Sequence, residues 1–171
     1  MEPIKLQALK KEITKLDNKT LIDICIRLAK HASENKELLN YLLFHSYDNQ
    51  TYIDELKQDI THTFSFSHRS EHSQTISLRH LLLRLNKQLK FIADKNKEAE
   101  ILTEFCTIFI EKININSYYP SLIQILYRQL VKLCQVVAKL DEDLQFDYQA
   151  HIETIFNALK KSQFYRNLQL V

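Results

Sequence analysis

The chain has 171 residues, of which 45% are apolar, and it carries 23 basic and 21 acidic side chains. This length allows a self-sufficient core without disulfides, and the near balance of charge gives no global reason to bind nucleic acid or an anionic membrane. The sequence contains no glycine, which excludes a phosphate-binding P-loop, a Rossmann fingerprint and a G-x-S-x-G nucleophile elbow, since each needs glycine at fixed positions.

The apolar residues from position 4 to position 60 recur with a helical spacing. They predict four short helices, over 4–16, 21–28, 38–43 and 52–60, with Asp17 or Asn18 as the cap of the second. We expect these helices to form a short helical hairpin region over residues 1–60.

The segment 61–72 interrupts this pattern, because THTFSFSH alternates polar and aromatic residues. Such alternation is typical of a strand, but a single strand would have no partner in a helical chain. We therefore predict an extended connector, which Phe64 and Phe66 attach to the core.

Long helical patterns fill residues 73–165. The first begins near Ser73 and has apolar residues at alternating steps of four and three, the spacing of a bundle or coiled-coil seam. These residues are Leu78, Leu82, Leu85, Leu89 and Ile92. Three more helices follow, and the one that starts at Pro120 is apolar over enough of its circumference to be the central helix. We predict that the seam helix, over 76–92, offers a surface for self-association.

Together these elements predict an all-α fold in one domain, 1–171, with the short helical hairpin region packed on a four-helix antiparallel bundle over 73–165. A HEAT-like stack of helical pairs is the alternative. The three cysteines lie far apart and form no C-x-x-C motif, so we expect reduced thiols and a cytoplasmic protein. The longest apolar run is far shorter than the ~20 residues that a membrane span needs.

The segment 4–47 opens with the Leu- and Lys-rich stretch IKLQALKKEITKL and continues to YLLF, which contains the pair Tyr41 and Leu42. It resembles the opening of small, uncharacterised all-helical bacterial proteins, in which a short helix leads into a helix-turn-helix that ends near a Tyr-Leu pair. That family has no assigned activity. The resemblance therefore implies a helical fold and implies nothing about function.

Four of the seven histidines lie between positions 61 and 80. His68 and His72 are four residues apart, the spacing at which two imidazole ligands share one helix face. Together with His62 and Asp59 they could form a shell for zinc or a similar divalent ion. The serines and the arginine around them favour a solvated loop instead, and we expect no bound cofactor.

Seven basic side chains and only two acidic ones lie between His68 and Lys97. Such a stripe could bind phosphates in a salt-dependent way. Its candidate nucleic-acid contacts are Arg69, Arg79, Arg84, Lys87 and Lys90. Four glutamates follow directly over residues 98–111, so pairing between two neighbouring helices explains the pattern equally well.

No nucleophile, base and acid form a recognisable catalytic pattern, which argues against an enzyme and leaves the question open. Tyr118 and Tyr119, paired before a helix start, are candidates for a contact surface. The leading hypothesis is a non-enzymatic helical module that binds another protein or itself. The alternatives are a nucleic-acid-binding accessory protein that uses the stripe 69–97, and a metal-binding protein that uses His62, His68 and His72.

Overall fold

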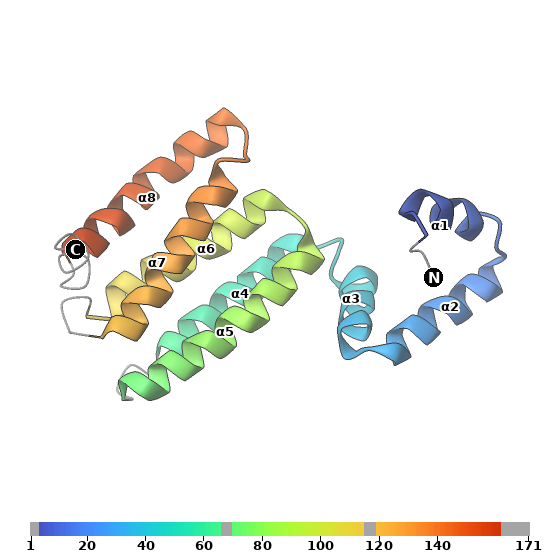
Figure 1. Cartoon of the computed structure of the whole chain (residues 1–171), viewed down its shortest axis with the longest axis horizontal. Helices are drawn as coiled ribbons and strands as arrows, with labels where there is room; N and C mark the ends of the chain where they lie inside the picture. Colours follow the sequence, from blue (N-terminus) through green and yellow to red (C-terminus); the bar gives the residue numbers. More distant parts are fainter. Residues whose placement is uncertain (1–3, 66–69, 115–118, 162–171) are drawn as a thin grey trace. The chain divides into compact units, whose positions relative to one another are not determined.

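The structure is a computed structural model of the whole chain, and it describes residues 4–65, 70–114 and 119–161. Within these ranges it contains eight α-helices and no β-strand (Figure 1). The all-α class predicted from the apolar spacing is therefore confirmed. The helices are α1 (Leu6–Ile13), α2 (Asn18–His31), α3 (Ser33–Phe44), α4 (Asn49–Phe64), α5 (Glu71–Ile92), α6 (Lys95–Lys112), α7 (Pro120–Val137) and α8 (Glu142–Lys161).

The chain divides into two compact units, the N-terminal unit (Met1–Tyr47) and the C-terminal unit (Asp48–Val171). Helices α1 to α3 form the first and α4 to α8 form the second. Helix α4, which we predicted as the last member of a short-helix region over 1–60, packs against α5 and α6 instead. It thereby joins the four long helices predicted over 73–165. A single domain over 1–171 stays a prediction.

Helix α6 is the centre of the C-terminal unit, because it contacts α4, α5, α7 and α8 (Figure 1). Several of its side chains have no exposed surface: Ala99, Ile101, Phe105, Cys106 and Phe109. The prediction that the helix starting at Pro120 would be central is wrong. That helix, α7, leaves Tyr127 and Val131 exposed to solvent, so one of its faces lies outside the core.

The connector predicted over 61–72 is wrong at both ends. Helix α4 continues through Phe64, and α5 already begins at Glu71, with the Ser70 hydroxyl accepting a hydrogen bond from the Ser73 N–H. Helix forms at 61–64 because its hydrogen bonds satisfy the backbone groups that an unpaired strand would leave open. Phe66 and His68 lie outside the described residues.

Phe64 is packed into the core, as predicted, but it attaches the end of helix α4 and not an extended connector. Its side chain is buried, and its ring lies edge-on to two rings of α6. The ring centroids are 5.5 Å apart for Phe64 and Phe105, and 5.9 Å apart for Phe64 and Phe109. This edge-to-face arrangement is the favourable one for aromatic side chains.

The seam of α5 is also buried, with Leu78, Leu82, Leu85, Leu89 and Ile92 all in the core of the C-terminal unit. The heptad-like spacing therefore found the correct face of the helix. The seam itself packs against the chain's own helices and is not free to associate, while self-association through the helix over 76–92 stays a prediction. The outer face of α5 carries Ile76 and Leu83 instead.

The N-terminal unit has a very different interior. Helices α1 and α2 contain no buried residue, and Tyr41 of α3 is the one buried side chain among residues 4–47. Helix α2 packs on α3. The Asp17 carboxylate caps α2 by accepting a hydrogen bond from the Thr20 N–H, as the sequence predicted. Capping stabilises such a helix by about 1 kcal/mol, but most helical stability comes from packing an apolar face.

Candidate interaction surface

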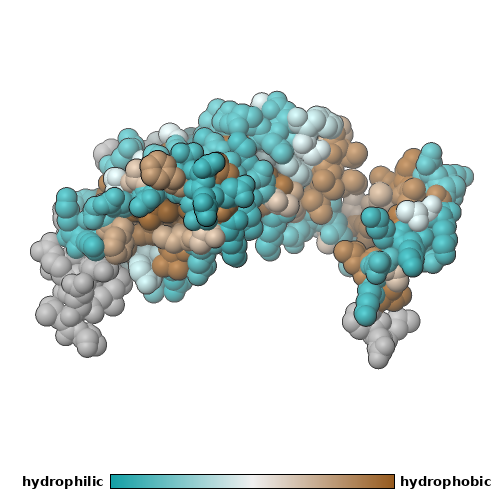
Figure 2. Space-filling view, turned by 90° about the horizontal axis from the view of Figure 1, so that it is seen from above, coloured by the Kyte–Doolittle hydropathy of each residue, from teal (hydrophilic) through white to brown (hydrophobic). Residues whose placement is uncertain are grey.

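The helices of the N-terminal unit expose their apolar faces (Figure 2). Thirteen large apolar side chains of this unit are exposed: Ile4, Leu6, Leu9, Ile13, Leu16, Ile22, Ile24, Ile26, Leu28, Leu42, Leu43, Phe44 and Tyr47. Scattered exposed apolar residues are normal on a protein surface. A whole amphipathic unit with its apolar side uncovered is not, since its helices then lack the burial that would stabilise them.

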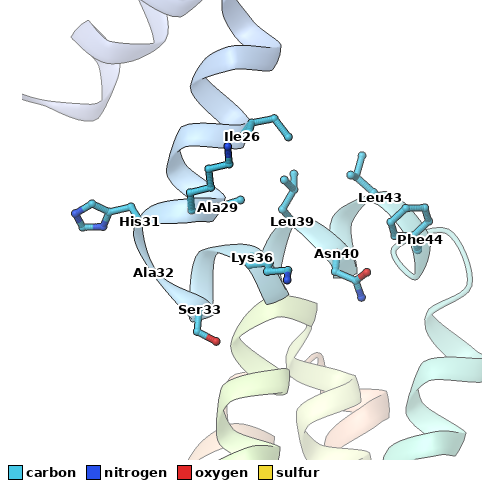
Figure 3. A pocket seen from close by; sticks show the side chains of 11 residues that line it. Ile26, Ala29, His31, Ala32, Ser33, Lys36, Leu39, Asn40, Leu43 and Phe44 are labelled. Atoms are coloured by element: carbon cyan, nitrogen blue, oxygen red, sulfur yellow. The ribbon is translucent and has the colours of Figure 1, made fainter.

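A groove runs between α2 and α3, with a cavity volume of about 660 Å³. Its lining residues are Ile26, Ala29, Lys30, His31, Ala32, Ser33, Lys36, Leu39, Asn40, Leu43 and Phe44. In Figure 3, Ile26 of α2 and Leu39 and Leu43 of α3 point toward the space between the two helices. The floor of the groove is therefore aliphatic and aromatic, which is typical of a site that binds an apolar partner.

The turn between α2 and α3 holds the groove open. Ala32 is extended, with φ −145° and ψ 142°, so the chain changes direction sharply after His31. The Asn35 side-chain amide donates a hydrogen bond of 2.9 Å to the Leu28 carbonyl oxygen, which satisfies one of the free carbonyls at the end of α2. This bond ties the two helices together at one end of the groove.

The charged side chains of the groove are basic. Lys30 and Lys36 line it, and none of its lining residues is acidic. His31 also belongs to the lining but points away from the groove in Figure 3. Neither lysine forms an ion pair with any residue in the described part of the chain. The apolar groove therefore carries positive charge that the described part of the chain does not neutralise.

Of the four residues predicted to bind a metal, the structure describes three. His62 lies exposed on α4 and His72 exposed on α5, while His68 lies outside the described residues. The Asp59 carboxylate pairs with the Arg84 guanidinium, with 3.1 Å between Oδ2 and Nη2. Among the described residues no three His, Cys, Asp or Glu side chains come close enough to hold a metal. A site that includes His68 stays a prediction.

The predicted basic stripe is partly paired within the chain. Arg84 binds Asp59, as just described, and Lys87 is half-buried. Arg79 and Lys90 are exposed on α5, and Arg69 lies outside the described residues. The structure thus brings Arg79, Arg84, Lys87 and Lys90 onto one helix and gives Arg84 a carboxylate partner.

The glutamates that follow the stripe form a network at the start of α6. Glu100 accepts from Lys57 of α4 at 2.6 Å and from Lys97 at 3.0 Å. Burial raises the pKa of Glu100, but the hydrogen bonds from the two lysines outweigh this effect and leave that pKa below its ordinary value. Glu98 pairs with Lys132 of α7 at 2.9 Å. These pairs link α6 to α4 and α7, which favours a structural role for the charges at this end of the stripe.

Of the two tyrosines predicted to form a contact surface, the structure describes one. Tyr119 is exposed at the position just before α7, and Tyr118 lies outside the described residues.

Sequence reasoning missed the groove between α2 and α3. The available signal was that α2 carries Ile22 and Ile26 in addition to its main stripe of Leu21, Ile24 and Leu28, which makes it apolar on two sides.

No protein-family model, no curated protein and no solved structure matches this chain. Across the described ranges, no helix combines the length and the apolar character that crossing a membrane requires.

Proposed function

We propose that this chain is a non-enzymatic, cytoplasmic helical module that binds another protein or itself through the N-terminal unit. The observation that carries this proposal is the uncovered apolar side of α1, α2 and α3. No other part of the described chain exposes a comparable set of large apolar side chains. The unit's own helices leave this surface uncovered, and a partner would bury it.

The size of the surface supports the proposal. Burying a fully exposed large apolar side chain contributes about 2.5 kcal/mol, at about 25 cal/mol per Å² of apolar surface, which corresponds to roughly 100 Å² for each side chain. The thirteen side chains are between 36% and 82% exposed, and together they offer roughly 700 Å² of apolar surface. A standard protein–protein interface buries about 800 Å² per partner, so the unit exposes enough apolar surface, spread over its three helices, to supply one.

Native mass spectrometry of the full chain, purified without a tag from the cells that make it, tests this function. The wild-type chain is expected to carry a stoichiometric protein component, either a second copy or a different chain. Replacing Ile22 and Leu43 by glutamine should release that component, because both side chains are exposed on the N-terminal unit.

A matched control replaces Ile76 and Leu83, which are exposed on α5 of the C-terminal unit, by glutamine. This control should keep the component. Far-UV circular dichroism checks that all three proteins retain their helix content. A bare monomer for the wild-type chain would refute the proposal, as would a component that the control loses and the Ile22/Leu43 variant keeps.

A further inference from the structure

The groove between α2 and α3 has the shape that accepts a helix. Ile26 lines it from one side and Leu39 and Leu43 from the other (Figure 3), and Phe44 also belongs to its lining. Helix α3 has 12 residues, a length of about 18 Å. A bound helix of three turns would match that length and place apolar side chains at i, i+3 or i+4, and i+7 into the groove.

The rim of the groove selects the charge of that helix. Lys30 and Lys36 are exposed, line the groove and have no carboxylate partner in the described part of the chain. Charged groups at the rim of an interface fix which partners bind, because like charges facing each other are unfavourable. A helix with acidic residues beside its apolar stripe complements both lysines.

We infer that the groove between α2 and α3 binds an acidic amphipathic helix of a partner protein. The inference rests on the proposed function and names the partner's chemistry. The chain's own exposed helix α1 fits poorly, since Glu12, its one acidic residue, pairs with Lys15 and leaves Lys10 and Lys11 to meet the basic rim. A second copy that docked through α1 would therefore be repelled.

Two other kinds of partner fit the groove less well. Nucleic acid binds through rows of phosphate contacts, whereas two lysines flank a floor of aliphatic and aromatic side chains here. A membrane surface binds helices that present one apolar face in the plane of the interface. The groove is concave, and α2 exposes apolar side chains on more than one side, including Ile22, Ile26 and Leu28.

The test is a selection from a displayed library of amphipathic helical peptides, with fixed apolar positions and random charged or polar residues elsewhere. The full chain is immobilised at physiological salt, and the enriched peptides are measured by fluorescence anisotropy. We expect the enriched peptides to be acidic. Leu43→Gln should weaken their binding at least about tenfold, because a central apolar contact is lost, whereas Leu83→Gln on α5 should leave it unchanged.

Charge reversal at the rim separates recognition from folding. The double variant Lys30→Glu, Lys36→Glu should lose about tenfold in affinity for the acidic peptides and should gain binding to basic peptides with the same apolar pattern. A misfolded groove would lose both kinds of peptide, so the exchange of preference supports the inference. Neutral or basic enriched peptides, or acidic peptides that ignore both groove variants, would overturn it.

The remaining outcomes distinguish this inference from the proposed function. Binders that Leu6→Gln releases and Leu43→Gln does not would place the interface on α1, which overturns the groove and keeps the module. A chain that only self-associates, or only sediments with anionic vesicles, in a way that Leu43→Gln abolishes would overturn the acidic helix as the partner. No enriched peptide, together with a bare monomer in native mass spectrometry, would overturn both.

Discussion

Phe64 is the residue whose removal tests the core of the C-terminal unit most directly. It is 3% exposed, at the last turn of α4. Its ring contacts Phe105 and Phe109 of α6, which lie 6.1 Å apart from each other by ring centroid. The three rings thus form one cluster, and Phe64 is the member that α4 contributes.

Replacing Phe64 by alanine should lower the free energy of unfolding by about 3–5 kcal/mol, the usual cost of removing a buried phenylalanine side chain. Part of this cost is the loss of two edge-to-face ring contacts, which contribute about 0.5–1.5 kcal/mol each. At a denaturant slope of about 2 kcal/mol per molar urea, the midpoint of unfolding should fall by roughly 2 M.

Urea unfolding followed by far-UV circular dichroism measures this change. The control is Phe146→Ala on α8, because Phe146 is 76% exposed and the same chemical change there should cost less than about 0.5 kcal/mol. Equal midpoints for the two variants, or a loss below about 1 kcal/mol for Phe64→Ala, would refute the reasoning that Phe64 holds α4 in the core.

Three further outcomes follow from burial and charge. Leu85→Lys should abolish the folded C-terminal unit, because Leu85 is 2% exposed and the substitution would bury a charge without a partner. Leu83→Lys on the same helix should unfold at the wild-type urea concentration. A folded Leu85→Lys protein would contradict the structure. A maleimide should label the exposed Cys25 and Cys134 in the native state and Cys106 only after unfolding. The reason is that Cys106 is buried, which raises the pKa of its thiol to about 12. Rapid labelling of all three cysteines in the native state would contradict this. The pKa of Glu100 is lower in the folded chain than in the unfolded chain. Its contribution to stability should therefore be present above the unfolded pKa and lost as pH falls through the folded pKa. When the free energy of unfolding is measured against pH, Glu100→Gln should lose less stability toward acid pH than wild type does.

The spacing of apolar residues predicted most of the C-terminal unit. The seam of α5 is buried at all five predicted positions, because a helix whose apolar residues recur at steps of three and four has only one side that can face a core. The sequence could not say whether that side would face the chain's own helices or another molecule. The position of α6 between four helices resolves this ambiguity for the seam, which faces the chain's own core.

The end of α4 was missed for a different reason. The alternation in THTFSFSH suggested extended backbone. Residues 61–63 are helical instead, because the Phe64 side chain reaches the core from a helical position. The Thr61 and Thr63 hydroxyls donate to the carbonyl oxygens of Lys57 and Asp59 one turn earlier, so these polar side chains are satisfied on the helix itself. Tertiary packing of one aromatic side chain therefore decided the local structure, and a window of eight residues does not contain that information.

The charged stripe shows what the sequence leaves open about a site. Counting charges found an excess of basic residues over 69–97, and it also found the glutamates that follow. Only the fold shows that Lys57, far away in sequence, approaches Glu100, and that Asp59 approaches Arg84. Pairing across helices depends on which helices are neighbours, and this depends on the whole core.

The N-terminal unit shows the same ambiguity between an apolar face and what covers it. Its helices have the same amphipathic spacing as those of the C-terminal unit, and a pattern of that kind specifies an apolar face without specifying what covers it. In the C-terminal unit each such face meets another helix. In the N-terminal unit the faces of α1 and α2 have no buried residue at all, although forming these helices has the same entropic cost. The proposed interface would cover these faces, and it would supply the carboxylates that Lys30 and Lys36 do not meet in the described part of the chain.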